Sequence, residues 1–187
     1  MAGRGALVGA AAAAFVLGMA GGWYAGRRSL DEPPPPQAYV NPLANAKKGE
    51  SLTLLRNDGT HFQFRVLEEQ PTSVLLRIES SPPGQPATSR EVRVSRTFFG
   101  PFLILDGDIP ANEADASMKD FRLEEARPES LRVDRLDRTV RCWRVTGTHR
   151  LFGTISYWIS DEFPVHGVVR FDAGRARFDI DSFDWGR

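Results

Sequence analysis

Residues 154–171, which read T-I-S-Y-W-I-S-D-E-F-P-V-H-G-V-V-R-F, constrain the fold of this chain more than any other stretch. The first part has a period of two in β-branched and aromatic residues, which is typical of a strand. Its alternating apolar positions are Ile155, Tyr157 and Ile159. Pro164 has no backbone N–H to donate to a sheet, so the strand must end before it or reach an edge. Gly167 allows a turn, and a second strand follows at 168–171. The pattern predicts two strands joined by a corner, as in a β-meander.

The same alternation recurs along most of the chain after residue 47, and no 3.6-residue period is sustained beyond residue 30. Asn57-Asp58-Gly59 between two such runs is a strong hairpin signal. We therefore predict an all-β fold of roughly nine or ten antiparallel strands, in a strongly curved sheet, a half-barrel or a barrel. The expected strands are 51–56, 61–67, 73–79, 90–96, 121–125, 130–133, 139–145, 154–160, 168–171 and 175–183. Turns are expected at 134–137, 146–150 and 172–174.

Residues 97–105, T-F-F-G-P-F-L-I-L, form the most apolar run outside the N-terminus. They fit either a strand buried on both faces or a loop that lines or plugs a cavity. The acidic stretch 106–120 that follows is expected to be a loop with a short helix near residues 113–118.

Residues 6–25 carry no charge and are flanked by Arg4 on one side and by Arg27 and Arg28 on the other. Twenty residues at 1.5 Å rise span roughly 30 Å, the thickness of the hydrocarbon core of a bilayer. Residues 1–28 therefore fit an uncleaved signal anchor. A cleaved signal peptide also fits the basic start and small residues, and a buried soluble helix is the remaining alternative.

Residues 29–46 are expected to form a linker, because residues 33–36 are four consecutive prolines that favour a stiff polyproline II segment. A docking site for a proline-reading module is the alternative. The β domain would then occupy residues 47–187. We expect a single-pass inner-membrane protein of the cell envelope with its C-terminal domain exported, or a periplasmic or secreted protein after cleavage. The membrane is the expected partner of residues 6–25.

Charge and cysteine content exclude several classes of protein. The chain has 24 basic and 24 acidic residues, so no net field attracts nucleic acid, and we predict no nucleic-acid partner. Cys142 is the one cysteine, which rules out an intramolecular disulfide.

No residue pattern in the chain matches a catalytic or metal-binding template. Cys142 and His149 flank a predicted turn and could approach each other, but no second close pair of ligands supports a metal site. Ser160, Asp161 and His166 have the residue types of a nucleophile system without the strand-turn-helix context that such a system needs. No glycine-rich loop indicates a nucleotide. We therefore predict no enzymatic activity, no metal and no cofactor.

A segment near the C-terminus resembles a known group of proteins. The pattern from Glu129-Ser130-Leu131 through Arg141-Cys142 to residues 157–164 resembles small secreted bacterial β-proteins, in which a strand ends in W-x-S ahead of a proline and a glycine. Their shape is similar to the open half-barrel of periplasmic lipoprotein carriers, which hold acyl chains in a concave apolar face. The resemblance implies shape and compartment only. The strand-end motif residues here are Trp158, Ser160, Pro164 and Gly167.

Two binding roles follow from these observations. The domain is expected to be a structural or protein-interaction module with an envelope protein as its partner. Alternatively, it carries an apolar ligand such as a lipid, which an interior cavity of at least about 300 Å³ would favour. The residues expected to line that cavity are Phe62, Phe64, Val66, Leu76, Ile78, Phe99, Phe102, Ile155, Tyr157 and Ile159.

Overall fold

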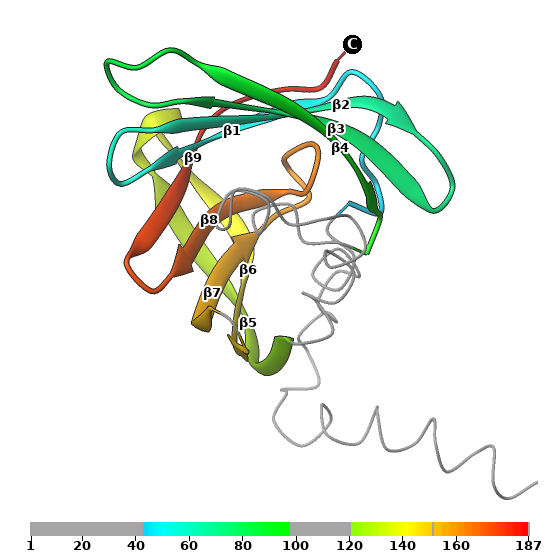
Figure 1. Ribbon diagram of the computed structural model, residues 1–187. Coiled ribbons are helices and arrows are strands. Elements are labelled where there is room, and N and C mark those ends of the chain that lie inside the picture. Colours follow the sequence, from blue (N-terminus) through cyan, green and yellow to red (C-terminus); the bar gives the residue numbers. More distant parts are fainter. Residues whose placement is uncertain (1–42, 98–120, 151, 187) are drawn as a thin grey trace, which may run out of the picture. The chain divides into compact units, whose positions relative to one another are not determined.

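The computed structural model describes residues 43–97, 121–150 and 152–186 (Figure 1). In these ranges the chain forms nine strands and one 3-10 turn, η3 (Asp134–Leu136), and no α-helix. The strands are β1 (Ser51–Arg56), β2 (His61–Glu69), β3 (Ser73–Ser81), β4 (Thr88–Ser95), β5 (Phe121–Val133), β6 (Arg138–His149), β7 (Gly153–Ile159), β8 (Val168–Ala173) and β9 (Ala176–Asp184). They form one antiparallel sheet, which confirms the prediction of an all-β fold.

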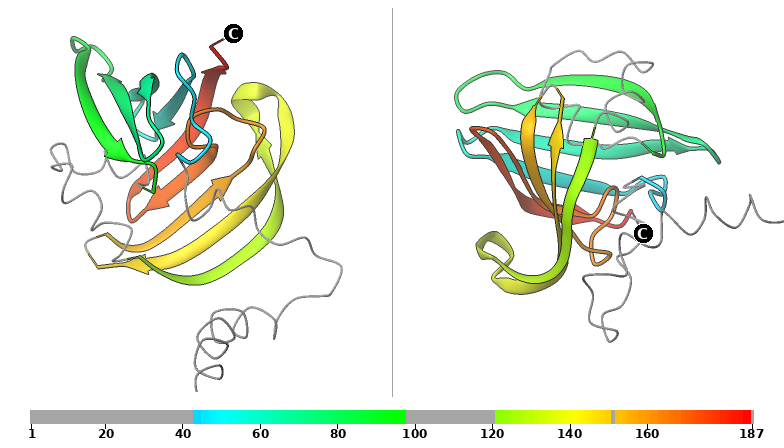
Figure 2. Two further views of the ribbon diagram at one scale, coloured as in Figure 1. Left: turned by 90° about the vertical axis from the view of Figure 1, so that its right-hand side faces the viewer. Right: turned by 90° about the horizontal axis from the view of Figure 1, so that it is seen from below.

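The strand order is β4-β3-β2-β1-β9-β8-β7-β6-β5, so two meanders meet where the first strand pairs with the last. Figure 2 shows that the sheet is curved. The edge strands β4 and β5 do not pair with each other within the described residues, so the sheet is not closed. The closed-barrel alternative is therefore wrong.

One face of the sheet supplies most of the core. Alternate residues of each strand point to it, and register places them side by side: Leu52 pairs with Phe64, which pairs with Ile78. In the other meander Tyr157 pairs with Phe171, and Phe171 pairs with Phe178. Burying each such side chain stabilises the fold by about 1.5–3 kcal/mol. The two meanders thus form one continuous core.

Two predicted breaks in the strands are wrong. The expected strands 121–125 and 130–133 form the single strand β5, which passes through Pro128. An edge strand tolerates proline because one side of its backbone need not donate to a neighbour. The expected turn at 146–150 lies mostly inside β6. Gly147 marks a close approach there, because an added Cβ would lie 2.5 Å from the Phe121 ring and 2.4 Å from the Arg122 carbonyl oxygen.

Smaller differences concern element ends. Strand β8 continues to Ala173, so the turn expected at 172–174 starts two residues later. Leu43 and Ala46 are buried in the core, so buried residues reach at least to Leu43, ahead of the expected domain start at residue 47.

Several expectations fall on residues outside the described ranges. These are the N-terminal segment 6–25, most of the linker, nearly all of the apolar run 97–105 and the short helix near 113–118. Among the residues that are described, no helix has the length and apolar character needed to cross a bilayer.

Candidate functional site: the buried loop 160–167

The loop that joins β7 to β8 is folded into the protein interior instead of lying on the surface. Asp161 and Glu162 are exposed, whereas Ser160 and every residue of 163–167 are buried. The loop is closed by hydrogen bonds from the Ser160 amide to the Gly167 carbonyl (2.9 Å) and from the Gly167 amide to the Pro164 carbonyl (3.0 Å). Figure 1 shows it between the two halves of the sheet. The strand-end motif therefore lies in and beside an inward-turned corner.

The backbone of this loop is strained at Val165. Its φ of +61° is in the left-handed region, which is disfavoured for any residue with a Cβ and is an outlier for a β-branched one. Gly167 has a φ of +62°, and an added Cβ there would lie 2.5 Å from the Ser160 carbonyl oxygen. The left-handed conformation of Val165 costs on the order of 1–3 kcal/mol and persists only where surrounding contacts hold it, whereas glycine adopts it freely.

Glu50 supplies one of the contacts that hold the loop. Its carboxylate oxygen Oε2 accepts hydrogen bonds from the amides of Val165 (3.1 Å) and Lys47 (3.0 Å). Glu50 is 4% exposed and lies immediately before β1. A buried carboxylate needs such donors to offset the loss of hydration. Sequence reasoning missed Glu50, because nothing local distinguishes it from a surface glutamate beside a turn.

His166 is fully buried and packs edge-on against Phe64 of β2, with ring centroids 5.0 Å apart. Its Nδ1 accepts the Val168 amide at 3.2 Å, so the proton of the neutral ring is on Nε2. Among the residues that the structure describes, Nε2 has no hydrogen-bond partner. Burial away from water lowers the pKa of His166 to about 3, so the ring is neutral at pH 7.

Phe163 attaches the other end of the loop to the sheet. Its ring contacts Phe183 of β9 edge-on at 5.1 Å, and the Arg138 guanidinium lies 4.9 Å from its centroid. Arg138 also pairs with Glu162 at 3.5 Å. The loop therefore contacts β2, β6 and β9, in addition to Glu50.

The residues Ser160, Asp161 and His166 do not form a hydrolytic site. Asp161 is exposed, Ser160 Oγ accepts the Glu162 amide at 3.3 Å, and neither ring nitrogen of His166 bonds to Ser160. The Ser160 hydroxyl therefore has no hydrogen bond to a general base from the described ranges in this arrangement.

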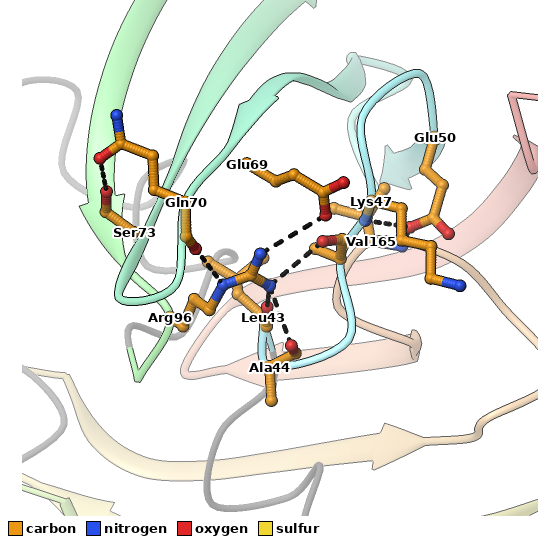
Figure 3. A network of polar contacts seen from close by, with 10 residues as sticks. Leu43, Ala44, Lys47, Glu50, Glu69, Gln70, Ser73, Arg96 and Val165 are labelled. Atoms are coloured by element: carbon orange, nitrogen blue, oxygen red, sulfur yellow. Dashed lines mark hydrogen bonds and ion pairs between the residues drawn. The ribbon is translucent and has the colours of Figure 1, made fainter.

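Arg96, just after β4, holds the start of the described chain in place (Figure 3). Its Nη1 donates to the carbonyls of Leu43 (3.0 Å), Ala44 (2.9 Å) and Ala46 (3.1 Å). Its Nε donates to the Gln70 carbonyl (2.7 Å), and a fifth contact is an ion pair with Glu69 at 3.5 Å. One guanidinium thus joins residues 43–46 to the β2–β3 turn, a role that the sequence did not indicate.

A row of charged side chains and Trp158 crosses the opposite face of the second meander. Cross-strand pairing brings together Arg127, Arg144, Trp158, Arg170 and Asp179. The guanidinium carbons of Arg144 and Arg170 lie 5.3 and 5.6 Å from the Trp158 ring, which is a cation–π geometry. Arg170 also bonds to Asp179 at 2.5 Å. Since Trp158 is only 6% exposed, its ring is a packed residue and not an open stacking surface.

The structure does not bring Cys142 and His149 together. Both lie on β6, seven residues apart, which at about 3.4 Å per residue separates them by more than 20 Å. The idea that they approach across a turn is therefore wrong. Within the described ranges, no group of three or more potential ligands could hold a metal ion.

The residues expected to line a ligand cavity are placed as follows. Eight of them belong to the buried core, namely Phe62, Phe64, Val66, Leu76, Ile78, Ile155, Tyr157 and Ile159. Phe99 and Phe102 lie outside the described residues. Their role toward a ligand stays a prediction.

Comparison of the chain with protein-family models, curated proteins and solved structures gives no match. The resemblance of the strand-end motif to secreted β-proteins stays a prediction as well.

Proposed function

We propose that this chain is a non-enzymatic interaction module of the cell envelope, in which a half-barrel β domain is tethered to or exported across the inner membrane. The observation that carries this proposal is the inward course of residues 160–167. Phe163, Val165 and His166 are each at most 4% exposed, so the chain's own loop takes up interior space that a carrier would leave for its ligand. Filling of small β-barrels by side chains is common.

The contacts of Arg96 support a domain that is held in a fixed position relative to its linker. Its contacts with residues 43–46 fix the chain to the sheet at the point where the predicted linker ends. A stiff proline-rich spacer joined to a fixed attachment would hold the domain at a set distance and orientation. Trp185, which is 37% exposed, is a large apolar side chain that a protein partner could cover.

Carriage of an apolar ligand is the second candidate, and His166 favours it. Its Nε2–H is a buried donor without an acceptor in the described part of the chain, beside Phe64 and the other apolar residues of the core. An ester or carboxylate oxygen of a lipid would satisfy that donor.

A photo-crosslinking experiment in the native host tests the interaction module. A crosslinking amino acid would replace Trp185 in the full chain, and exposed Gln85 in the β3–β4 connection provides the matched control. The proposal expects one protein adduct of defined mass in the membrane fraction at position 185 and none at position 85. Adducts to lipid alone, or a full chain found entirely in the cytosol, would overturn it.

A further inference from the structure

We propose that residues 43–50 and loop 160–167 form a latch, in which Arg96 and Glu50 couple the position of the incoming linker to a strained loop in the interior. The coupling itself does not depend on the proposed function. The proposed function adds only a biological reason for the linker to be displaced. Each connection in the latch is a contact between described residues.

The first connection is the attachment of residues 43–46 by Arg96. Three carbonyls of this segment share the two N–H groups of Arg96 Nη1, and the Arg96 amide itself donates to the Thr72 carbonyl at 3.0 Å. The Arg96 side chain is 17% exposed, so water competes weakly for these bonds. Movement of residues 43–46 away from the sheet would require all three bonds to break.

The second connection is the tight turn that leads from Ala46 to β1. The Glu50 amide donates to the Lys47 carbonyl at 3.2 Å, and the Lys47 amide donates to the Glu50 carboxylate at 3.0 Å. Gly49 and Glu50 also exchange backbone bonds of 2.9 Å with Val66 of β2. Because the carboxylate is bound to the Lys47 amide, a shift of residues 43–47 pulls directly on the Glu50 side chain.

The third connection is the hydrogen bond from the Val165 amide to Glu50. Val165 is held at a φ of +61°, and its neighbour His166 is buried with one ring nitrogen unsatisfied. The loop is therefore in a conformation that it would leave if an attachment were lost. Release would bring Phe163, Pro164 and Val165 toward solvent as a new apolar surface. Displacement of the linker would thus change the surface that the domain exposes to a protein partner.

Hydrogen exchange of the full chain in mild detergent tests the latch through Arg96→Met. This variant keeps the aliphatic stem and removes the guanidinium. The matched control is Arg93→Met, which removes an arginine of β4, three residues before Arg96, that pairs at 2.5 Å with Glu68 on the surface. We expect Arg96→Met to accelerate exchange at the Val165, Gly167 and Val168 amides about tenfold, as for loss of one strong hydrogen bond. Arg93→Met should leave those rates within about twofold.

A second variant separates coupling from general destabilisation. Val165→Gly removes the strain without removing the amide that bonds to Glu50. In this background, Arg96→Met should accelerate loop exchange by less than about twofold, which gives a non-zero interaction term in the double-mutant cycle. Three results would overturn the latch. The first is faster exchange only at residues 43–50, and the second is uniformly faster exchange that includes the Tyr157 amide in β7. The third is an effect of Arg96→Met that is unchanged in the Val165→Gly background.

Discussion

The amide of Val165 donates a 3.1 Å hydrogen bond to the carboxylate of Glu50, 115 residues earlier in the chain. This bond joins the segment before β1 to the loop between β7 and β8, so it connects the two meanders away from their shared β1–β9 pairing. A buried carboxylate thereby stabilises a backbone conformation that valine does not adopt by itself. Residues 163–167 of the loop are consequently part of the core, while Asp161 and Glu162 reach the surface.

The close approach at Gly167 predicts a large loss of stability in Gly167→Ala. The matched control is Gly174→Ala, since Gly174 has nearly the same φ, +60°, but nothing within 4 Å of an added Cβ. Both variants carry the cost of a left-handed alanine, about 1 kcal/mol. Gly167→Ala adds the clash with the Ser160 carbonyl, so urea denaturation should show it at least about 2 kcal/mol less stable than Gly174→Ala. Equal stability of the two variants would contradict the described corner.

The burial of His166 predicts a loss of stability in acid. Its pKa is lowered to about 3 in the fold, while the unfolded chain has the ordinary value near 6.5. Below pH 6.5 the unfolded state takes up a proton that the folded state does not, so stability falls by about 1.4 kcal/mol per pH unit until about pH 3. His166→Asn keeps an acceptor near the Nδ1 position and removes the titration.

Denaturation midpoints between pH 7 and pH 4 measure this effect. As pH falls, the natural chain should lose more stability than His166→Asn does. His61→Asn, which alters a half-exposed histidine on β2, controls for loss of a histidine. Parallel pH profiles for the natural chain and His166→Asn would show that the ring is not buried.

We expect substitution of Asp172 on β8 to stabilise the fold. Burial raises the pKa of its carboxyl despite the nearby guanidinium groups of Arg177 and Arg170. Its Oδ1 lies 3.8 Å from Arg177 Nε and has no hydrogen bond within the described residues. The folded state therefore binds this proton more tightly than the unfolded chain does, and the contribution to stability is lost as pH rises through the raised pKa. Asp172→Asn should raise the melting temperature at pH 7, with the gain vanishing near pH 3. Asp179→Asn, which removes the 2.5 Å bond from Arg170, should lower it instead. A lower melting temperature for Asp172→Asn at pH 7 would refute this assignment.

Cys142 on β6 should react slowly with thiol reagents. It is 5% exposed, and burial raises the pKa of its thiol to about 11, helped by the nearby Glu129 carboxylate. The thiolate is the reactive form, so labelling at pH 8 should be at least about a hundredfold slower in the native chain than in urea. The chain has a single cysteine, so the absorbance change reports on this site alone. Rapid labelling of the native chain would show that β6 is open at this position.

Strand positions were predictable because they depend on a local signal, the period of two between apolar and polar residues. The runs around Phe62, Leu76 and Tyr157 show it clearly, and each is a strand. The breaks predicted at 126–129 and 146–150 are wrong, because what Pro128 and Gly147 do in these strands depends on topology. Proline is tolerated where β5 is an edge, and glycine is needed where the Phe121 ring crosses β6.

The candidate site was only partly predictable. Pro164 and Gly167 correctly indicated a corner after a strand. That this corner turns inward depends on Glu50 and Phe64, which are distant in sequence, and no local pattern encodes such a contact. The three-carbonyl contact of Arg96 was hidden for the same reason.

Native mass spectrometry of the full chain, purified in detergent from its own host, tests the central claim that the domain's interior is filled by its own loop. If the loop fills the interior, the chain, with or without cleavage of its N-terminal segment, should have the mass of the polypeptide alone once detergent is removed. His166→Leu, which removes the unsatisfied donor, should give the same spectrum apart from the mass of the substitution. A stoichiometric lipid that co-purifies with the natural chain and is lost from His166→Leu would show that the interior holds a ligand and that the domain is a carrier.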